Sequence, residues 1–203
     1  MKKESIKKFI VVSIVFIASI IGIYHYYSNI HKEELENESI EVFIEDSTNK
    51  NKKVDKKKEE SKTKEVIKYV AVLEIPKIDL KRGLVDPSSY KNNVGQNIEI
   101  LNPTSMPDEE NHTFMLASHS GSSQVAYFKD LDKLSNGDFV YVYYKDIKYT
   151  YKIVRNYREK KTGSITIQKD GEESVIVLTS CSRSNKEQLI YIGKLESKGT
   201  FSE

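Results

Sequence analysis

The feature that most restricts the fold of this chain is a set of short segments, between residues 67 and 203, in which apolar and polar residues alternate. A period of two sends successive side chains to opposite faces of a β-strand, so it predicts strands with one buried face. Four segments show this alternation: residues 69–75, 139–144, 149–154 and 189–195. Two continuous apolar runs, at residues 113–117 and 175–178, predict strands that are buried on both faces.

The connections between these segments favour a small β-barrel. A tight link at residues 146–148 joins two tyrosine-rich segments into a predicted hairpin. The main helical signal lies at residues 123–134, where apolar residues form one face and Gly137 follows as a stop signal. About eight strands and a few short helices in a domain of about 137 residues predict a mainly β fold, an eight-stranded closed or nearly closed barrel.

The first 27 residues carry the pattern of a membrane anchor. Residues 9–24 are almost continuously apolar and follow lysines at positions 2, 3, 7 and 8. This length lies between that of a signal-peptide core and that of a spanning helix. Aromatic residues extend the segment to residue 27, and no small-x-small cleavage pattern closes it. We interpret residues 1–8 as a basic cytoplasmic tail and residues 9–27 as an uncleaved signal-anchor transmembrane helix, with the rest of the chain outside the cell. A removed signal peptide is the alternative, and it leaves the same domain outside.

Residues 28–66 predict a charged, flexible tether that precedes a domain at residues 67–203. An acidic block is followed by a basic one, with few apolar residues to offset the entropy of ordering them. The apolar residues 40–44 can pair with the domain, but a solvated spacer is the favoured interpretation. The formal net charge of +2 gives no reason to expect nucleic acid as a partner. The lysine-rich patches are typical of solvated surface near an anionic membrane or wall.

A single cysteine, Cys181, stands at the end of the predicted strand that begins near residue 175. One cysteine cannot form an internal disulfide, so the thiol suggests a reactive group or an intermolecular bridge. A nucleophilic thiol usually has a histidine or another positive group nearby. The domain offers His112, in a charged loop and therefore predicted to be exposed and inert, and His119, at the end of another strand. His119 and Cys181 can meet at one rim of a barrel, although a structural histidine at a strand end has the same pattern.

Two motifs around these residues resemble those of sortases. The segment FMLASHSG, which contains His119, resembles the L-A-x-H segment of that family, and VLTSC, which ends at Cys181, resembles its T-L-x-T-C motif. The cysteine follows the histidine by about sixty residues, as in the family. LEIPKIDL resembles the first strand, AYFKDLDKLSNGDFVYVYY the stretch after the histidine, and YIGKL the closing strand. The resemblance covers nearly the whole domain.

The resemblance implies a sortase-type barrel and a cysteine transpeptidase of the Gram-positive cell surface, a thiol peptidase of the hydrolase class. Sortases cleave an L-P-x-T-G-type sorting motif near the C-terminus of secreted proteins, through a thioacyl enzyme. They pass the acyl group to an amine of a peptidoglycan precursor or of a pilin lysine in cell-wall protein anchoring. By this resemblance Cys181 is the nucleophile, His119 is the general acid and base, and Ser180 lies beside the substrate.

The sequence departs from the family pattern around the cysteine. Val177 and Ser180 replace the two threonines of T-L-x-T-C, and Ser118 replaces the small residue before the histidine. A larger departure is Gln188, which stands where sortases carry an arginine that contacts the substrate backbone or the oxyanion. A glutamine amide can donate a hydrogen bond but brings no charge, and one oxyanion donor is worth about 2.7 to 4 kcal/mol.

Several arginines are candidates to replace the family arginine. Arg183, two residues after the nucleophile, is the nearest in sequence and is our predicted third catalytic residue, although a solvated loop arginine has the same pattern. Gln188 is predicted to bind substrate, and Arg155 and Arg158 are weaker candidates. No cofactor or metal is predicted, and a dependence on calcium stays open.

The subclass and the activity leave alternatives. The connection between residues 156 and 174 is too short for the inserted helix of class B enzymes, and no Asp-Pro-aromatic lid precedes the barrel, so the domain resembles class A or class D. One alternative function is a catalytically impaired sortase-fold module that only binds surface proteins. Another is a secreted cysteine protease that transfers the acyl group to water.

Overall fold

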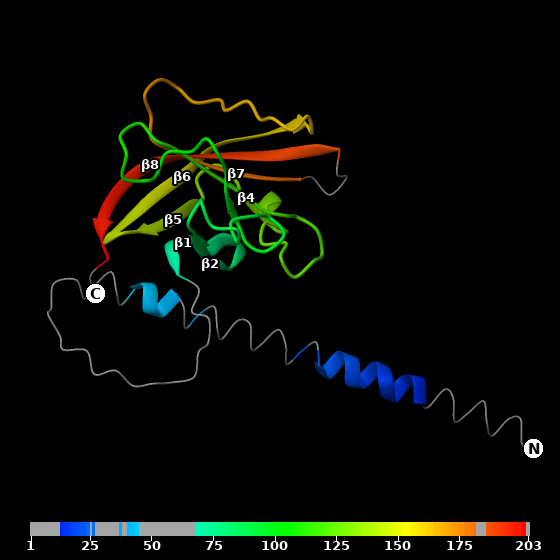
Figure 1. Cartoon of the computed structure of the whole chain (residues 1–203). Coiled ribbons are helices and arrows are strands. Elements are labelled where there is room, and N and C mark those ends of the chain that lie inside the picture. Colours follow the sequence, from blue (N-terminus) through cyan, green and yellow to red (C-terminus); the bar gives the residue numbers. More distant parts are fainter. Residues whose placement is uncertain are drawn as a thin grey trace, which may run out of the picture. The chain divides into compact units, whose positions relative to one another are not determined.

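The computed structural model describes residues 13–24, 26, 37, 40–44, 68–181 and 186–201, which fall into two compact units, Met1–Glu38 and Ser39–Glu203. In the first unit, residues 13–24 form a helix, blue in Figure 1, whose large apolar side chains are exposed. Within the described residues, no helix is long and apolar enough to span a membrane. The predicted tail at 1–8 and the remaining residues of the predicted anchor, apart from residue 26, lie outside the description.

The second unit contains one eight-stranded sheet with the strand order β2-β1-β5-β6-β8-β7-β4-β3 (Figure 1). Neighbouring strands are antiparallel, except for β4 and β7, which are parallel. The strands are β1 (Tyr69–Ile75), β2 (Leu80–Val85), β3 (Glu99–Ile100), β4 (Thr113–Ala117), β5 (Phe139–Tyr144), β6 (Ile147–Lys160), β7 (Val175–Cys181) and β8 (Glu187–Thr200). Two 3-10 turns lie between the strands: η2 (Pro76–Ile78) and η3 (Leu131–Lys133).

A buried asparagine links the two edge strands, β2 and β3, and so nearly closes the barrel. Asn97 lies two residues before β3 and is 4% exposed. Its side-chain amide donates to the Gly83 carbonyl on β2 at 2.9 Å and accepts from Arg82 Nε at 2.9 Å. These bonds satisfy polar groups that an open sheet edge would leave unpaired. The predicted nearly closed eight-stranded barrel is confirmed.

β7 is buried on both faces, as the sequence predicts. Six of its seven residues are buried. Ile176 and Leu178 face the main core inside the barrel, whereas Val175 and Val177 belong to a second apolar cluster on the outer face. The second cluster, called here the outer cluster, also contains Met115, Ile190 and Ile192, with Leu101, Tyr157, Ile165 and Ile167 packed against it. Each fully buried aliphatic side chain stabilises the fold by about 1.5 to 3 kcal/mol, so this strand is held firmly in the middle of the sheet.

The predicted helix at residues 123–134 is wrong. This segment is a series of turns that ends in η3. Phe128, Leu131 and Leu134 are buried at intervals of three residues, and the backbone bonds Leu131 N to Phe128 O and Leu134 N to Leu131 O also span three residues. A spacing of three matches 3-10 geometry, in which residues i and i+3 share one side, so core packing favours tight turns here over an α-helix.

Two strands are longer than predicted. β6 and β8 each contain 14 residues, and they pair along nearly their whole lengths. The hairpin between β5 and β6 is confirmed, although its turn is at Lys145 and Asp146, where Lys145 has a φ of 54°.

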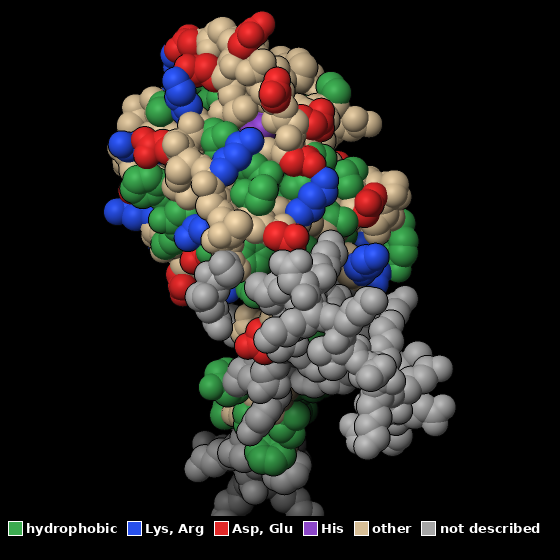
Figure 2. Space-filling model, turned by 90° about the vertical axis from the view of Figure 1, so that its left-hand side faces the viewer, with side chains coloured by type: hydrophobic (Ala, Val, Ile, Leu, Met, Phe, Trp, Pro, Cys, Tyr) green, Lys and Arg blue, Asp and Glu red, His purple; other side chains and the backbone are tan. Residues whose placement is uncertain are grey.

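The left-hand side of Figure 1, seen face on in Figure 2, carries basic and acidic side chains interspersed with hydrophobic ones. Charge of one sign therefore does not gather on this face.

Part of the predicted tether packs on the barrel. Residues 40–44 are helical, and Ile40 is 2% exposed in a cluster with Tyr69, Val72 and Val85. Tyr69 and Val72 lie on β1 and Val85 lies on β2, and covering these apolar side chains offsets the cost of ordering a short helical segment. These five residues therefore pack on the barrel and do not form a solvated spacer. Apart from residue 37, the rest of the stretch 28–66 lies outside the described residues.

Candidate active site

The parallel pairing of β4 with β7 brings the ends of these two strands together. The ladder pairs Ala117 with Thr179. Contacts continue beyond it, because Ser118 N donates to Thr179 O at 3.3 Å and Ser120 Oγ donates to the Cys181 carbonyl. The chain segments that carry His119 and Cys181 therefore run side by side past the end of the ladder.

The alternation along β4 and β7, extended past the end of the ladder, predicts that His119 and Cys181 share one face. On β4, Met115 belongs to the outer cluster, Ala117 ends the strand one period later, and His119 lies two residues beyond it. On β7, Val177 belongs to the outer cluster, and the same alternation leads to Cys181. Extended by two residues beyond Ala117, the register of the ladder predicts the histidine opposite the cysteine. His119 is exposed and Cys181 is half-buried, so both lie where an external peptide can reach them.

Ser180 lies on the opposite face of β7 from Cys181. It is 5% exposed, and its hydroxyl donates to the Ser118 carbonyl at 2.7 Å. Ser118 is itself 3% exposed, and its Oγ donates to the Val125 carbonyl at 3.4 Å. The Ser180 hydroxyl therefore ties β7 to the end of β4. It does not point to the face that carries Cys181, where the motif implies a substrate contact.

Gln188 is the direct partner of Cys181 across the β7–β8 ladder. It is half-buried, and its Nε2 donates to the Ser164 carbonyl at 2.6 Å. The residue at the family arginine position is therefore beside the cysteine, but its amide is bonded to the connection between β6 and β7. Arg183, our predicted catalytic arginine, lies outside the described residues.

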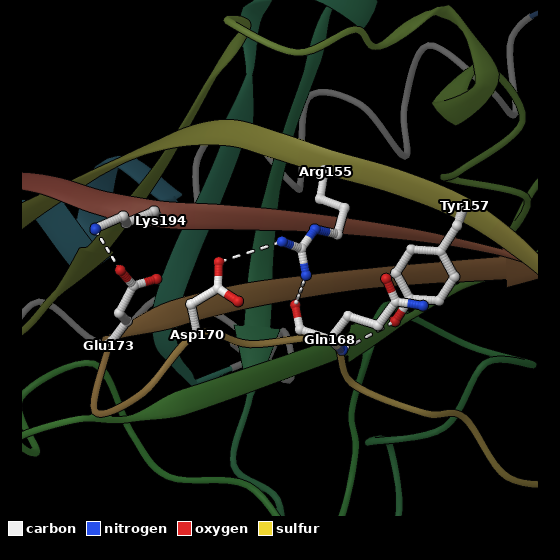
Figure 3. Close-up of polar contacts among 6 residues, drawn as sticks. All are labelled: Arg155, Tyr157, Gln168, Asp170, Glu173 and Lys194. Carbon is white, nitrogen blue, oxygen red and sulfur yellow. Dashed lines mark hydrogen bonds and ion pairs between the residues drawn. The ribbon is translucent and has the colours of Figure 1, made fainter.

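The two weaker arginine candidates on β6 have partners elsewhere. Arg155 donates to the Gln168 carbonyl at 3.0 Å and pairs with Asp170 at 3.2 Å (Figure 3). Arg158 lies 3.8 Å from Glu187. Neither contact reaches Cys181, so the structure does not bring these arginines to the cysteine.

His112 is buried, which corrects the prediction that it is exposed. Its exposure is 0%, with Nδ1 at 2.9 Å from the Glu109 carbonyl and Nε2 at 2.7 Å from the Tyr151 hydroxyl. A carbonyl can only accept, so Nδ1 carries the proton and Nε2 accepts from Tyr151. Burial lowers the pKa of His112 and raises that of Tyr151. Tyr149 and Tyr151 alternate on the buried face of their strand, and their hydroxyls are the one sequence signal for polar contacts inside this end of the barrel.

An open surface depression lies at the paired ends of β6 and β8, lined by Lys160, Lys161, Thr162, Lys186 and Glu187. The lining is mainly basic. Among the residues that the structure describes, no group of three or more His, Cys, Asp or Glu side chains is arranged to hold a metal ion.

The eight-stranded barrel with a parallel β4–β7 pair and a cysteine at the end of β7 is a sortase barrel, and the comparisons with known proteins agree. A family model described as the Sortase domain matches residues 73–196, more than half of the chain. The chain belongs to the sortase family. No curated protein sequence matches it.

Solved sortase structures share the fold at low sequence identity. Listeria monocytogenes sortase A is 15% identical, with a TM-score of 0.57, over 66% of this chain and 92% of that one. Streptococcus pneumoniae sortase C is 22% identical, with a TM-score of 0.58, over 68% and 75% of the two chains. A Clostridium perfringens sortase D5 transpeptidase is 23% identical, with a TM-score of 0.54, over 64% and 79%. Because sortases A, C and D score alike, the comparisons show the fold and do not select a subclass.

Proposed function

We propose that this sortase is a cysteine transpeptidase that cleaves an L-P-x-T-G-type sorting motif in secreted surface proteins and transfers the acyl group to an amine. The observation that supports the proposal is the parallel pairing of β4 with β7, with the Ser118–Thr179 and Ser120–Cys181 hydrogen bonds beyond it, which keep the segments that carry His119 and Cys181 side by side. A thiol and an imidazole at adjacent strand ends are the two groups that nucleophilic acyl transfer needs.

In the proposed reaction the Cys181 thiolate attacks the carbonyl carbon of the motif's threonine. The C–S bond forms, the peptide C–N bond breaks, and the protonated His119 gives its proton to the leaving amine. An incoming amine then attacks the thioester and loses a proton to His119 as the thiolate leaves. We propose an amine of a peptidoglycan precursor or a pilin lysine as the acceptor; the S. pneumoniae sortase C has a pilin substrate specificity.

We further propose that Arg183 donates to the oxyanion. A charged donor stabilises a developing anion more strongly than a neutral amide does. Arg183→Ala should lower turnover by about a hundredfold or more, the scale of one lost oxyanion donor. A normal rate for this variant would transfer the role to another donor.

We also propose that residues 9–27 anchor the chain in the cell membrane as a single pass, with residues 1–8 in the cytoplasm and the barrel outside. The apolar segment, the lysines before it and the charged stretch at 28–66 support this orientation. It would place the barrel on the same side of the membrane as the secreted proteins that carry sorting motifs.

A second candidate function is a surface module that binds sorting-motif peptides without cleaving them. The observation that favours it is Gln188, which puts a neutral side chain, already bonded to Ser164, at the family arginine position. Transpeptidation and binding alone predict different products from the same peptide.

The test incubates the full chain, in a mild detergent, with an L-P-x-T-G peptide and an amine such as glycinamide, and measures products by mass. We expect cleavage after the threonine and a ligated product. Cys181→Ala should give neither product nor thioacyl adduct while it keeps the circular dichroism of the parent, because removing a half-buried thiol leaves little cavity. Undiminished cleavage by Cys181→Ala would refute the nucleophile, and peptide binding without cleavage by the parent would support the binding module.

A further inference from the structure

The connection between β6 and β7 contains an extended segment, residues 164–168, that is held against the barrel by side chains. Ile165 and Ile167 are half-buried in the outer cluster, whereas the residues between and beside them are exposed. This alternation has the period of a β-strand. Figure 1 shows the connection returning along β6 after that strand ends. We call residues 164–168 the crossing segment.

Three side chains bind successive backbone groups of the crossing segment. Gln188 Nε2 donates to the Ser164 carbonyl at 2.6 Å, and Glu159 Oε2 accepts from Thr166 N at 3.1 Å. The Tyr157 hydroxyl donates to the Thr166 carbonyl and accepts from Gln168 N at 3.3 Å. The crossing segment thus has backbone partners at every second residue, although it joins no sheet.

Contacts further along hold the rest of the connection. Arg155 donates to the Gln168 carbonyl at 3.0 Å and pairs with Asp170, and Lys194 on β8 pairs with Glu173 just before β7 begins (Figure 3). Alternate residues of β6, at positions 155, 157 and 159, therefore match alternate residues of the connection. Because β6 and the connection both repeat every two residues, the side chains on one face of β6 can bind successive backbone groups of an extended chain.

The crossing segment is fastened directly beside Cys181. The ladders place Glu159, Gln188 and Cys181 in one row across β6, β8 and β7. In-register residues on neighbouring strands point to the same face, so all three side chains belong to the outer face. Tyr157 is in the next row on this face, opposite Ile190, which is opposite Thr179. The Tyr157 hydroxyl makes both of its hydrogen bonds to the crossing segment, at Thr166 and Gln168.

We infer that Gln188 is a positioning residue: together with Tyr157 and Glu159 it holds the crossing segment as a preformed wall of the donor-peptide groove, on the β8 side of Cys181. This inference rests on the proposed transpeptidase function. A wall that is fixed before binding spares the cost of ordering it when the peptide arrives. Gln188 acts on the peptide through Ser164, so its loss weakens binding of the donor peptide and leaves the chemical step nearly unchanged.

A double-mutant cycle on the full chain tests this role. Gln188→Met removes the donor at similar length, and Tyr157→Phe removes only the hydroxyl. Each variant should raise KM for the L-P-x-T-G donor peptide by about fivefold, the effect of one hydrogen bond, with kcat within about twofold of the parent. The double variant should raise KM by less than the product of the single effects, because both side chains fasten the same segment. Tyr141→Phe is the matched control, since within the described chain the Tyr141 hydroxyl has no hydrogen-bond partner.

Amide hydrogen exchange gives a second readout that needs no activity. Exchange at Thr166 and Gln168 should be faster in both variants than in the parent and unchanged in Tyr141→Phe. A fall in kcat for Gln188→Met, with normal KM and normal exchange at residues 164–168, would overturn the inference in favour of direct contact with the reacting groups. Fully additive effects on KM would overturn it as well. If the parent cleaves no peptide, the proposed function fails by itself, and the exchange data still decide whether these side chains hold the crossing segment.

Discussion

The two histidines of the barrel stand at opposite ends of β4 and have opposite environments. His112 precedes the strand, is fully buried, and has both ring nitrogens bonded within the protein. His119 lies two residues after the last residue of the strand and is exposed. One strand of five residues thus separates a histidine with a single fixed tautomer from one whose side chain is exposed to solvent.

The difference shows that the packing around each end of β4 decides what its histidine can do. Before β4, the His112 carbonyl accepts from Val175 N at 2.8 Å, so the histidine also ties β4 to the start of β7. After β4, Ser118 N donates to Thr179 O, and Ser120 Oγ donates to the Cys181 carbonyl. The buried end ties β4 to the start of β7, and the parallel pairing that follows keeps the segments with His119 and Cys181 side by side at the other end.

The largest expected effect is on turnover at the exposed end. His119→Ala should lower the transpeptidation rate by about 10²- to 10⁴-fold, because no general acid or base then serves the amine. His112→Ala, assayed at a temperature at which it is folded, should keep most of the parent rate. Product formation by mass spectrometry measures both, and equal losses in the two variants would remove the reason for assigning different roles to the two ends.

At the buried end the largest expected effect is on stability. His112→Ala creates a cavity and leaves the Tyr151 hydroxyl without its partner, so the free energy of unfolding should fall by about 3 kcal/mol. Urea unfolding can be followed by tyrosine fluorescence, since the chain has 13 tyrosines and no tryptophan. His119→Ala is the matched control and should unfold at nearly the parent midpoint; a parent-like midpoint for His112→Ala would contradict a structural role.

Acid should weaken the buried end. Burial lowers the pKa of His112, Lys198 and Lys169 lower it further, and Glu109 opposes them. From about pH 6.5 downward the unfolded chain binds a proton at this histidine while the folded chain stays neutral. The contribution to stability is therefore complete above pH 6.5 and is lost as the pH falls toward the lower folded pKa. The slope reaches up to about 1.4 kcal/mol per pH unit.

A comparison with His112→Gln separates this titration from that of the carboxylates. Urea midpoints measured in small steps below pH 6.5 should fall more steeply for the parent than for the variant. Parallel curves for the two proteins would mean that His112 does not titrate differently in the folded and unfolded chains.

The smallest effect is expected from the partner of His112. Tyr151→Phe keeps the ring in the core and removes only the hydroxyl, so it should cost about 1 to 2 kcal/mol, less than His112→Ala. The double variant, with His112→Ala, should cost less than the sum of the single changes, because the two side chains share one hydrogen bond. Additive losses in urea unfolding would show that the pair is not coupled.

Local patterns in the sequence were enough for the frame of the site. The alternation at 69–75 and 139–144 and the apolar run at 113–117 match β1, β5 and β4 at both ends, and the position of Cys181 at a strand end is confirmed. These features depend on residues that are neighbours in the chain, since a period of two by itself selects one buried face. The family motifs then identified the fold.

The sequence by itself therefore determined β1, β4 and β5, the barrel, and the position of Cys181 at a strand end. Only the tertiary structure decided that His112 is buried, that residues 123–134 form turns, that residues 40–44 cover β1, and that Gln188 holds Ser164. The physical reason is the same in each case. Gln188 and Ser164 are 24 residues apart, and His112 and Tyr151 are 39 apart, so their contacts depend on how distant segments pack and not on the local pattern around either residue.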